Sequence, residues 1–162
     1  MWEQLVTVLT NMLKLYQALL TISKQKHEIL VAAKAQELEA ITKQEELLII
    51  QIGKLETNRE QVLQEILTAN KITDENINVS RLAECTDEVM GKRIKDLWQE
   101  FDKVTVELVR LNELNTRLIE QALSYINYNV NLLTQASTGP TYAAKGQQPQ
   151  NATNRAVFDQ KI

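Results

Sequence analysis

A seven-residue repeat of apolar residues runs through the middle of this sequence. Steps of three and four residues alternate without interruption from position 38 to position 69. This repeat is typical of an α-helix that packs along a coiled-coil-like seam, because a 3.5-residue period keeps one stripe facing a partner helix. The seam positions are Leu38, Ile41, Glu45, Leu48, Ile52, Leu55, Arg59, Val62, Ile66 and Ala69.

Two further segments carry the same pattern. The longer series is Ile94, Leu97, Phe101, Val104, Leu108, Leu111, Asn115, Leu118, Ala122, Tyr125, Asn129 and Leu132. A shorter one near the N-terminus is Trp2, Leu5, Leu9, Met12, Tyr16 and Leu19. Three helices with apolar seams predict an all-α fold, an elongated antiparallel helical bundle or coiled coil of three long helices.

Glycine and proline, the residues that interrupt helices, are nearly missing from the first 138 residues, which contain Gly53, Gly91 and no Pro. We expect helices over about residues 2–31, 35–70 and 87–136. The join VAAKA between the first two has no Gly or Pro, so one continuous or kinked helix is the alternative. Turn-forming residues in KITDENINVS mark the next break, where Ser80 can cap a short turn. Thr86 or Asp87 can cap the last helix.

The segment STGPTYAAKGQQPQNAT cannot build a core, so we expect a helical bundle domain over residues 1–136 and a flexible, disordered tail over 137–162. The tail nevertheless ends in NRAVFDQKI. One hypothesis is that Phe158 anchors the tail on the apolar surface of the bundle and shields it. The alternative is a merely disordered end.

Composition excludes several classes of protein. A net charge of −3 and a pI near 5.3 argue against binding to nucleic acid. The N-terminal segment lacks a basic n-region and carries Asn11, Lys14 and Gln17, which argues against a signal peptide or stable membrane insertion and for a cytoplasmic protein.

No catalytic or metal-binding constellation is present in the sequence. His27 is the single histidine and is expected on a solvated face, and Cys85 is expected to be a small, partly buried residue. We therefore expect neither an enzyme nor a cofactor.

Polar residues interrupt two of the seams, and two interpretations are open. Glu45, Arg59, Asn115 and Asn129 could fix the register of the helices, or their side chains could reach out to water at the edge of the bundle. Trp98 and Phe101, one turn apart, are expected to anchor the core.

The last helix is expected to have about 50 residues and a length of roughly 75 Å, against roughly 54 Å for the second helix. Its end carries a second apolar stripe beside the seam. Either the bundle covers both stripes, or this end offers a groove for a partner helix. Tyr125 and Tyr128 lie there on neighbouring faces, and tyrosine is common at interfaces. The second stripe comprises Ile119, Leu123, Ile126, Val130 and Leu133.

Two segments carry a family resemblance. LEAITKQEELLIIQIGKLETNREQVL and LNELNTRLIEQALSYINYNVNLL resemble the helices of the FlgN-type flagellar export chaperones, and the closing FDQKI is similar to the short Phe-containing tail of many members. The resemblance covers most of the chain in order.

The resemblance implies a cytoplasmic, all-helical chaperone without catalytic activity or cofactors. Such proteins bind the terminal helices of hook-filament junction proteins, prevent their premature association and deliver them to the flagellar type III export apparatus. It implies a contact with the export gate for Tyr125 or Tyr128. It places the client-binding residues on the last helix, at Leu118, Ile119, Ala122, Leu123, Ile126, Val130 and Leu133.

Two alternatives stay open from the sequence. A structural coiled-coil protein that oligomerises through its seams would show the same heptads and the same polar interruptions. A chaperone for another type III export substrate would share the fold and the apolar end.

Overall fold

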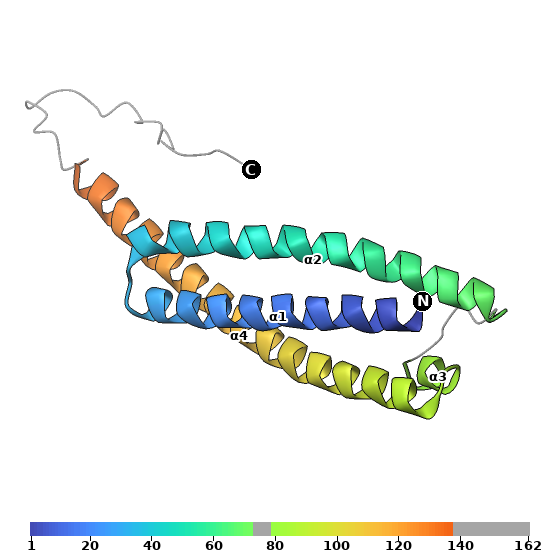
Figure 1. Ribbon diagram of the computed structural model, residues 1–162. Helices are drawn as coiled ribbons and strands as arrows, with labels where there is room; N and C mark the ends of the chain where they lie inside the picture. Colours follow the sequence, from blue (N-terminus) through green and yellow to red (C-terminus); the bar gives the residue numbers. More distant parts are fainter. Residues whose placement is uncertain (73–78, 138–162) are drawn as a thin grey trace, which may run out of the picture. The chain divides into compact units, whose positions relative to one another are not determined.

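A computed structural model describes residues 1–72 and 79–137 of the chain. Its regular structure is helical throughout these ranges, which confirms the predicted all-α class (Figure 1). The helices are α1 (Trp2–Val31), α2 (Ala35–Ala69), α3 (Val79–Glu84) and α4 (Glu88–Ser137). Four helices are therefore described where three were predicted, because the turn expected near Ser80 is itself the short helix α3.

The chain divides into two units, Met1–Leu123 and Ser124–Ile162, and the division falls within α4. The first unit contains α1, α2, α3 and the larger part of α4. The described part of the second unit is the last turns of α4. The 50 residues of α4 against the 35 of α2 confirm the predicted difference in helix length.

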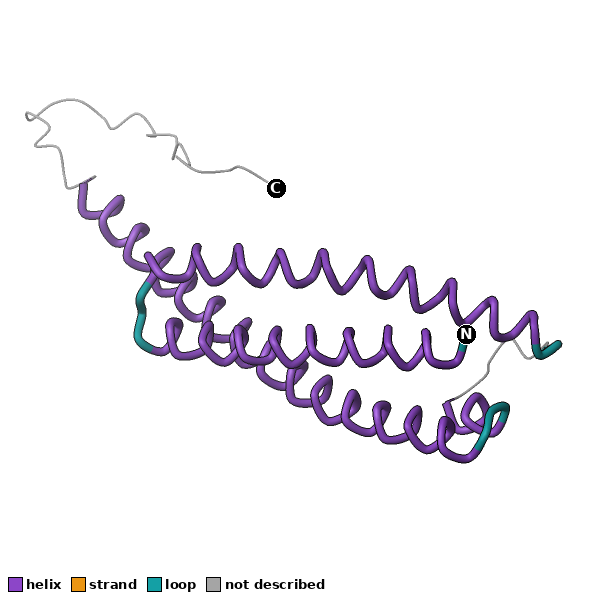
Figure 2. The backbone as a smooth tube through the Cα atoms, viewed as in Figure 1, coloured by secondary structure: helices purple, strands orange, loops and turns teal. Residues whose placement is uncertain are grey.

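Within the first unit, α1 and α2 lie side by side and run in opposite directions (Figures 1 and 2). Contacts between α1 and α4 show that these two helices run in parallel: Glu3 pairs with Arg93, the rings of Tyr16 and Phe101 are 4.6 Å apart, and Ser23 bonds to Asn112. The three long helices therefore alternate in direction within the first unit: α2 is antiparallel to α1, and α4, which follows the direction of α1, is antiparallel to α2.

Most seam positions predicted from the heptads face the interior, whereas Ala69 at the end of α2 and Ala122, Tyr125 and Leu132 near the end of α4 are exposed. A core forms where the start of α1, the end of α2, α3 and the start of α4 meet, and burial of such side chains contributes roughly 1.5–3 kcal/mol each. Leu5, Ile66 and Ile94 are almost completely buried there. The cluster comprises Leu5, Val6, Leu9, Val62, Ile66, Leu82, Ala83, Met90 and Ile94.

The join between α1 and α2 is a sharp corner, drawn as the teal loop that follows α1 in Figure 2, so the alternative of one continuous helix is wrong. Ala33 adopts a left-handed conformation (φ 53°), and the Lys34 amide donates to the Ile29 carbonyl at 3.0 Å. This is a Schellman-type C-cap, which glycine usually occupies. Lys71 (φ 53°) ends α2 in the same way.

The start of α4 confirms one of the two predicted caps. The Oδ1 atom of Asp87 accepts a hydrogen bond from the Met90 amide at 3.0 Å. This satisfies an amide that the helix itself leaves without a partner, as an N-cap does.

Trp98 corrects the sequence interpretation. Its side chain is 49% exposed, so it is no core anchor. Trp98 stands one turn before the seam residue Phe101, off the seam itself, and its ring stacks on Phe101 with the centroids 6.3 Å apart. Phe101 is half-buried and packs on Tyr16.

Helix α1 has the length and apolar composition of a membrane span. Core helices of water-soluble bundles pass the same test, and eight α1 residues are buried within the first unit. Length and composition alone therefore do not identify α1 as a span.

Candidate functional site

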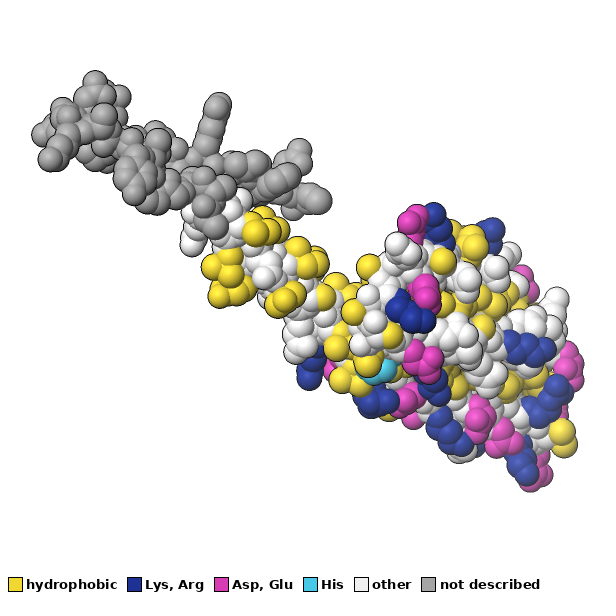
Figure 3. Space-filling model, turned by 90° about the vertical axis from the view of Figure 1, so that its left-hand side faces the viewer, with side chains coloured by type: hydrophobic (Ala, Val, Ile, Leu, Met, Phe, Trp, Pro, Cys, Tyr) yellow, Lys and Arg dark blue, Asp and Glu magenta, His cyan; other side chains and the backbone are white. Residues whose placement is uncertain are grey.

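The seven candidate residues of α4 differ in burial. In the first unit, Leu118 and Ile119 are half-buried, whereas Ala122 and Leu123 are exposed. In the second unit, Ile126, Val130 and Leu133 are 54%, 45% and 72% exposed. Large aliphatic side chains are thus open to solvent on the last turns of α4, where Figure 3 shows hydrophobic side chains gathered.

Helical geometry places these residues on one face. Positions 119, 123, 126, 130 and 133 follow one another in steps of four and three, and such positions lie one above the other on an α-helix. Asn127, Asn131 and Thr134 border this face on one side. We call the face formed by Ile126, Val130 and Leu133, all in the second unit, the apolar stripe.

The two tyrosines predicted at this end are both exposed, Tyr125 by 70% and Tyr128 by 61%. Tyr125 lies nearer the apolar stripe, beside Asn129, whose amide donates to the Tyr125 carbonyl at 2.8 Å. Tyr128 lies toward the opposite, polar face of α4. Both phenol rings are open to a partner, from two different sides of the helix.

A polar cluster between α1 and α4 contains Asn115, for which fixing the helix register was one of the two sequence interpretations, but its partners on α1 were not predicted. The side-chain amide of Asn115, which is buried, donates to the Ser23 carbonyl at 3.0 Å. The Ser23 hydroxyl donates to Oδ1 of Asn112 at 2.7 Å. Nδ1 of His27 lies 2.9 Å from Oδ1 of Asn115. Among the described residues every buried side-chain polar atom has a partner, so this cluster is a fully bonded register device.

His27 is therefore half-buried against Asn115, and the solvated position expected for it is wrong. The SKQKHE segment gave no sign of this, because the partner of His27 is 88 residues away on another helix. The sequence feature that could have predicted this contact is a polar residue in the seam of one helix together with a single His on another helix.

The two ionic seam residues behave differently from each other. Glu45 forms an ion pair across the helices with Lys26 at 2.6 Å, with little solvent around either side chain. Arg59 instead donates from Nε to Glu56 of its own helix at 3.1 Å, and this bond raises the pKa of Arg59. Glu45 thus ties α2 to α1, whereas the half-buried Arg59 is bonded within α2.

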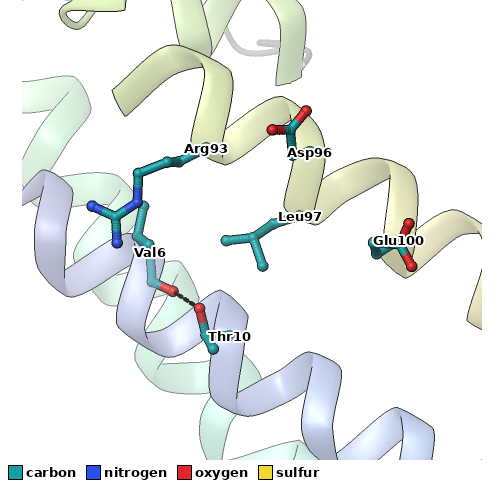
Figure 4. Close-up of a pocket in the computed structure, with 6 residues that line it drawn as sticks. All are labelled: Val6, Thr10, Arg93, Asp96, Leu97 and Glu100. Carbon is teal, nitrogen blue, oxygen red and sulfur yellow. Dashed lines mark hydrogen bonds between the residues drawn. The ribbon is translucent and has the colours of Figure 1, made fainter. Parts of the chain in front are cut away.

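A shallow cleft of about 290 Å³ lies between α1 and α4 (Figure 4). Val6 and Leu97 form its apolar part, and Arg93, Asp96 and Glu100 stand on the α4 side. The hydroxyl of Thr10 donates to the Val6 carbonyl at 2.7 Å, so it is engaged by its own helix. No group of three or more metal-ligating side chains lies together among the described residues.

Helix α2 carries a second exposed apolar group. Leu47, Ile49 and Ile50 are 61%, 54% and 56% exposed, whereas the neighbouring seam residues Leu48 and Ile52 are half-buried. The run LLII has apolar residues at more positions than one seam can bury. This excess is the sequence feature that could have predicted an exposed apolar group on α2.

Two further sequence predictions have different outcomes: one is confirmed, and the other concerns residues outside the described part of the chain. Cys85 is half-buried, as expected, and its thiol donates to the Arg81 carbonyl at 3.2 Å. Phe158 and the tail over 137–162 fall outside the described residues, apart from Ser137 at the end of α4.

Comparison with known proteins defines the class of this chain. The model of the family described as "FlgN protein" matches residues 1–150. The chain therefore belongs to the FlgN family, a family of flagellar export chaperones.

A curated relative agrees in length. The chain is 26% identical over 161 residues, 98% of each protein, to the Bacillus subtilis (strain 168) protein named "Uncharacterized protein YvyG". No solved structure matches.

Proposed function

We propose that this chain is a cytoplasmic chaperone that binds the terminal helices of hook-filament junction proteins and delivers them to the flagellar type III export apparatus. The observation that carries the proposal is the exposed apolar stripe on the last turns of α4, in a chain of the FlgN family.

The mechanism follows from helix packing. A client's amphipathic terminal helix lays its apolar face on the apolar stripe, with anchors at i, i+3, i+4 and i+7. This covers the client surface that would otherwise pair prematurely with other subunits. Ordering a disordered client segment costs conformational entropy, which keeps the affinity moderate and allows release at the export gate.

The deciding experiment is co-expression with the terminal segment of a hook-filament junction protein, followed by co-purification. The variant Ile126→Glu/Val130→Glu places two charges on the apolar stripe and is expected to abolish the complex. Gln121→Glu/Gln135→Glu adds the same two charges on the opposite face of α4 and should bind normally. Circular dichroism checks that both variants stay helical. A complex that survives the stripe substitutions would place the client elsewhere.

We infer that Tyr125 or Tyr128, which lie on different sides of α4, contacts the export gate. Each is replaced by Ala in turn. The gate-contacting tyrosine is the one whose loss stops secretion of the junction protein while the chaperone–client complex still forms. If both variants secrete normally, the gate contacts another surface.

The structural alternative was a coiled-coil protein that oligomerises through its seams. Since most seam residues pack within the chain, the exposed α2 residues Leu47, Ile49 and Ile50 are the surface on which association of copies is tested. Leu47→Glu/Ile50→Glu tests it: a shift from oligomer to monomer in sedimentation velocity, without loss of client binding, would show that this surface joins copies of the chain. A chaperone of another export substrate would instead bind filament or cap protein segments in the same co-expression assay.

A further inference from the structure

The last turns of α4 differ from the rest of the helix in charge. Up to Glu120 the helix carries charged residues in every turn, several of them paired, as in Arg110 with Glu107 and Lys103 with Glu100. From Gln121 to Ser137 no residue is charged. Figure 3 shows the same contrast, with hydrophobic and uncharged polar side chains alone over this segment.

The residues on one side of the apolar stripe are two amides and a hydroxyl, Asn127, Asn131 and Thr134. Asn127 and Asn131 are exposed, and their side chains make no hydrogen bond within the described part of the chain. An amide offers both a donor and an acceptor without a charge. The stripe is thus bordered by groups that can bond to a neutral polar partner.

Neutral borders restrict the partner. In helix pairs, charges that flank an apolar seam select the partner and set its orientation. A charged partner side chain brought against this border would lose hydration and gain no opposite charge in return, which is unfavourable. A partner whose flanking residues are Ser, Thr, Asn or Gln would bond to the amides instead.

We propose that the apolar stripe binds an amphipathic helix whose flanks are uncharged, and that it selects its clients by apolar register and length rather than by charge. This inference rests on the proposed function and specifies the client helix. It implies that one stripe accepts different clients that share an apolar period. It also implies that binding tolerates changes in salt.

The test measures the dissociation constant for the junction protein's terminal segment at 50 and 500 mM NaCl, by calorimetry. For the wild-type chain we expect a change of less than about twofold, because no ion pair contributes to the interface. A dissociation constant that rises about tenfold or more with salt would show charge pairing and overturn the inference.

Two single substitutions with opposite charges give the sharper result. Asn127→Asp and Asn127→Lys should each weaken binding, by about tenfold, because either charge is desolvated beside a neutral partner. If the client flank is charged, one of the two variants should bind it more tightly and the other more weakly than the wild type. That outcome would refute the neutral-partner inference. Gln121→Glu, an isosteric charge on the far face, is the matched control and should leave affinity unchanged.

Failure of this inference is separable from failure of the proposed function. If no complex forms, or if Ile126→Glu/Val130→Glu still binds, the proposed function fails. If the complex forms and depends on the stripe but responds to salt and to the sign of the Asn127 charge, only the neutral-partner inference fails. Sedimentation velocity of the chain alone gives a third outcome: self-association abolished by Ile126→Glu/Val130→Glu would make a second copy the occupant and overturn the inference.

Discussion

The side-chain amide of Asn115 on α4 donates a hydrogen bond to the backbone carbonyl of Ser23 on α1, 3.0 Å away, and both residues are buried. This bond joins two helices that run in the same direction and are far apart in sequence. Its neighbours His27 and Asn112 complete the cluster. The alignment of α1 on α4 therefore depends on polar contacts as well as on the apolar seam.

Replacing Asn115 by Ala should lower the free energy of unfolding by about 2 kcal/mol, because it removes a buried partner of His27 and Ser23. Urea denaturation followed by circular dichroism measures the change. Asn129→Ala is the control, since the amide of Asn129 bonds to its own helix. Its effect should stay within about 0.5 kcal/mol. Equal effects of the two substitutions would show that the cluster contributes nothing specific.

The ion pair between Lys26 and Glu45 offers a second test. Glu45→Leu alone leaves the Lys26 ammonium poorly solvated and should cost about 2 kcal/mol, whereas Lys26→Met/Glu45→Leu should lie within about 1 kcal/mol of the wild type. The exposed pair Lys43–Glu39 is the control for the double-mutant cycle, with an expected coupling of about 0.3–0.5 kcal/mol. If the coupling of Lys26 with Glu45 is no larger than this, the pair does not tie α2 to α1.

The two helical glycines should respond to alanine with opposite signs. A Cβ added at Gly53 meets nothing within 4 Å, so Gly53→Ala should raise stability by about 1 kcal/mol through helix propensity. A Cβ at Gly91 would lie 2.4 Å from the Ala83 carbonyl oxygen, where α3 meets α4. Gly91→Ala should therefore lower stability by about 1–3 kcal/mol. Thermal unfolding of both variants checks the signs, and a stabilised Gly91→Ala would disprove the close approach.

The corner after α1 should gain from glycine. Ala33 is left-handed (φ 53°), a conformation that costs an L-residue free energy, so Ala33→Gly should raise stability by about 0.5–1 kcal/mol. Ala32 stands next to it in the right-handed region (φ −79°), where the same change should stabilise nothing. We expect the urea concentration at the unfolding midpoint to rise for Ala33→Gly and not to rise for Ala32→Gly.

Amide hydrogen exchange should be fastest in the last turns of α4. Residues from Ser124 to Gln135 are almost all exposed and include Asn and β-branched residues with low helix propensity, without ion pairs to support them. Amides around Val104 and Leu111, which are buried, should exchange far more slowly. Client binding should slow exchange in the last turns specifically. Uniform exchange along α4 would contradict this.

The sequence predicted what depends on a single helix. The heptads located the seam residues Ile41, Val62 and Ile66. Turn-forming residues narrowed the cap of α4 to Thr86 or Asp87, and Asp87 forms it. Features set by a second helix were not predictable in this way. His27 was placed in solvent because its partner Asn115 is on α4, and Trp98 was placed in the core because nothing in its own helix shows which flank has a neighbour.

The candidate site was likewise predictable only in the features that depend on one helix. The period of Ile126, Val130 and Leu133 could be found from spacing, and their exposure agrees with a face open to a partner. The conformation of the corner at Ala33 could not be predicted, because a left-handed alanine has no sequence signature of the kind that glycine gives. The identity of the client depends on groups outside this chain, which only binding experiments supply.

The parallel arrangement of α1 and α4 has a consequence for synthesis. Ser23 and Asn115 are 92 residues apart, so α1 leaves the ribosome long before the helix that completes its packing. The α1–α2 hairpin is expected to form first, with one side of an unusually apolar helix still uncovered. Ribosome-bound chains stalled before residue 88 should then bind a hydrophobic dye or a general chaperone, and chains stalled well after residue 123 should not. A member of a chaperone family would then itself need protection while it is being made.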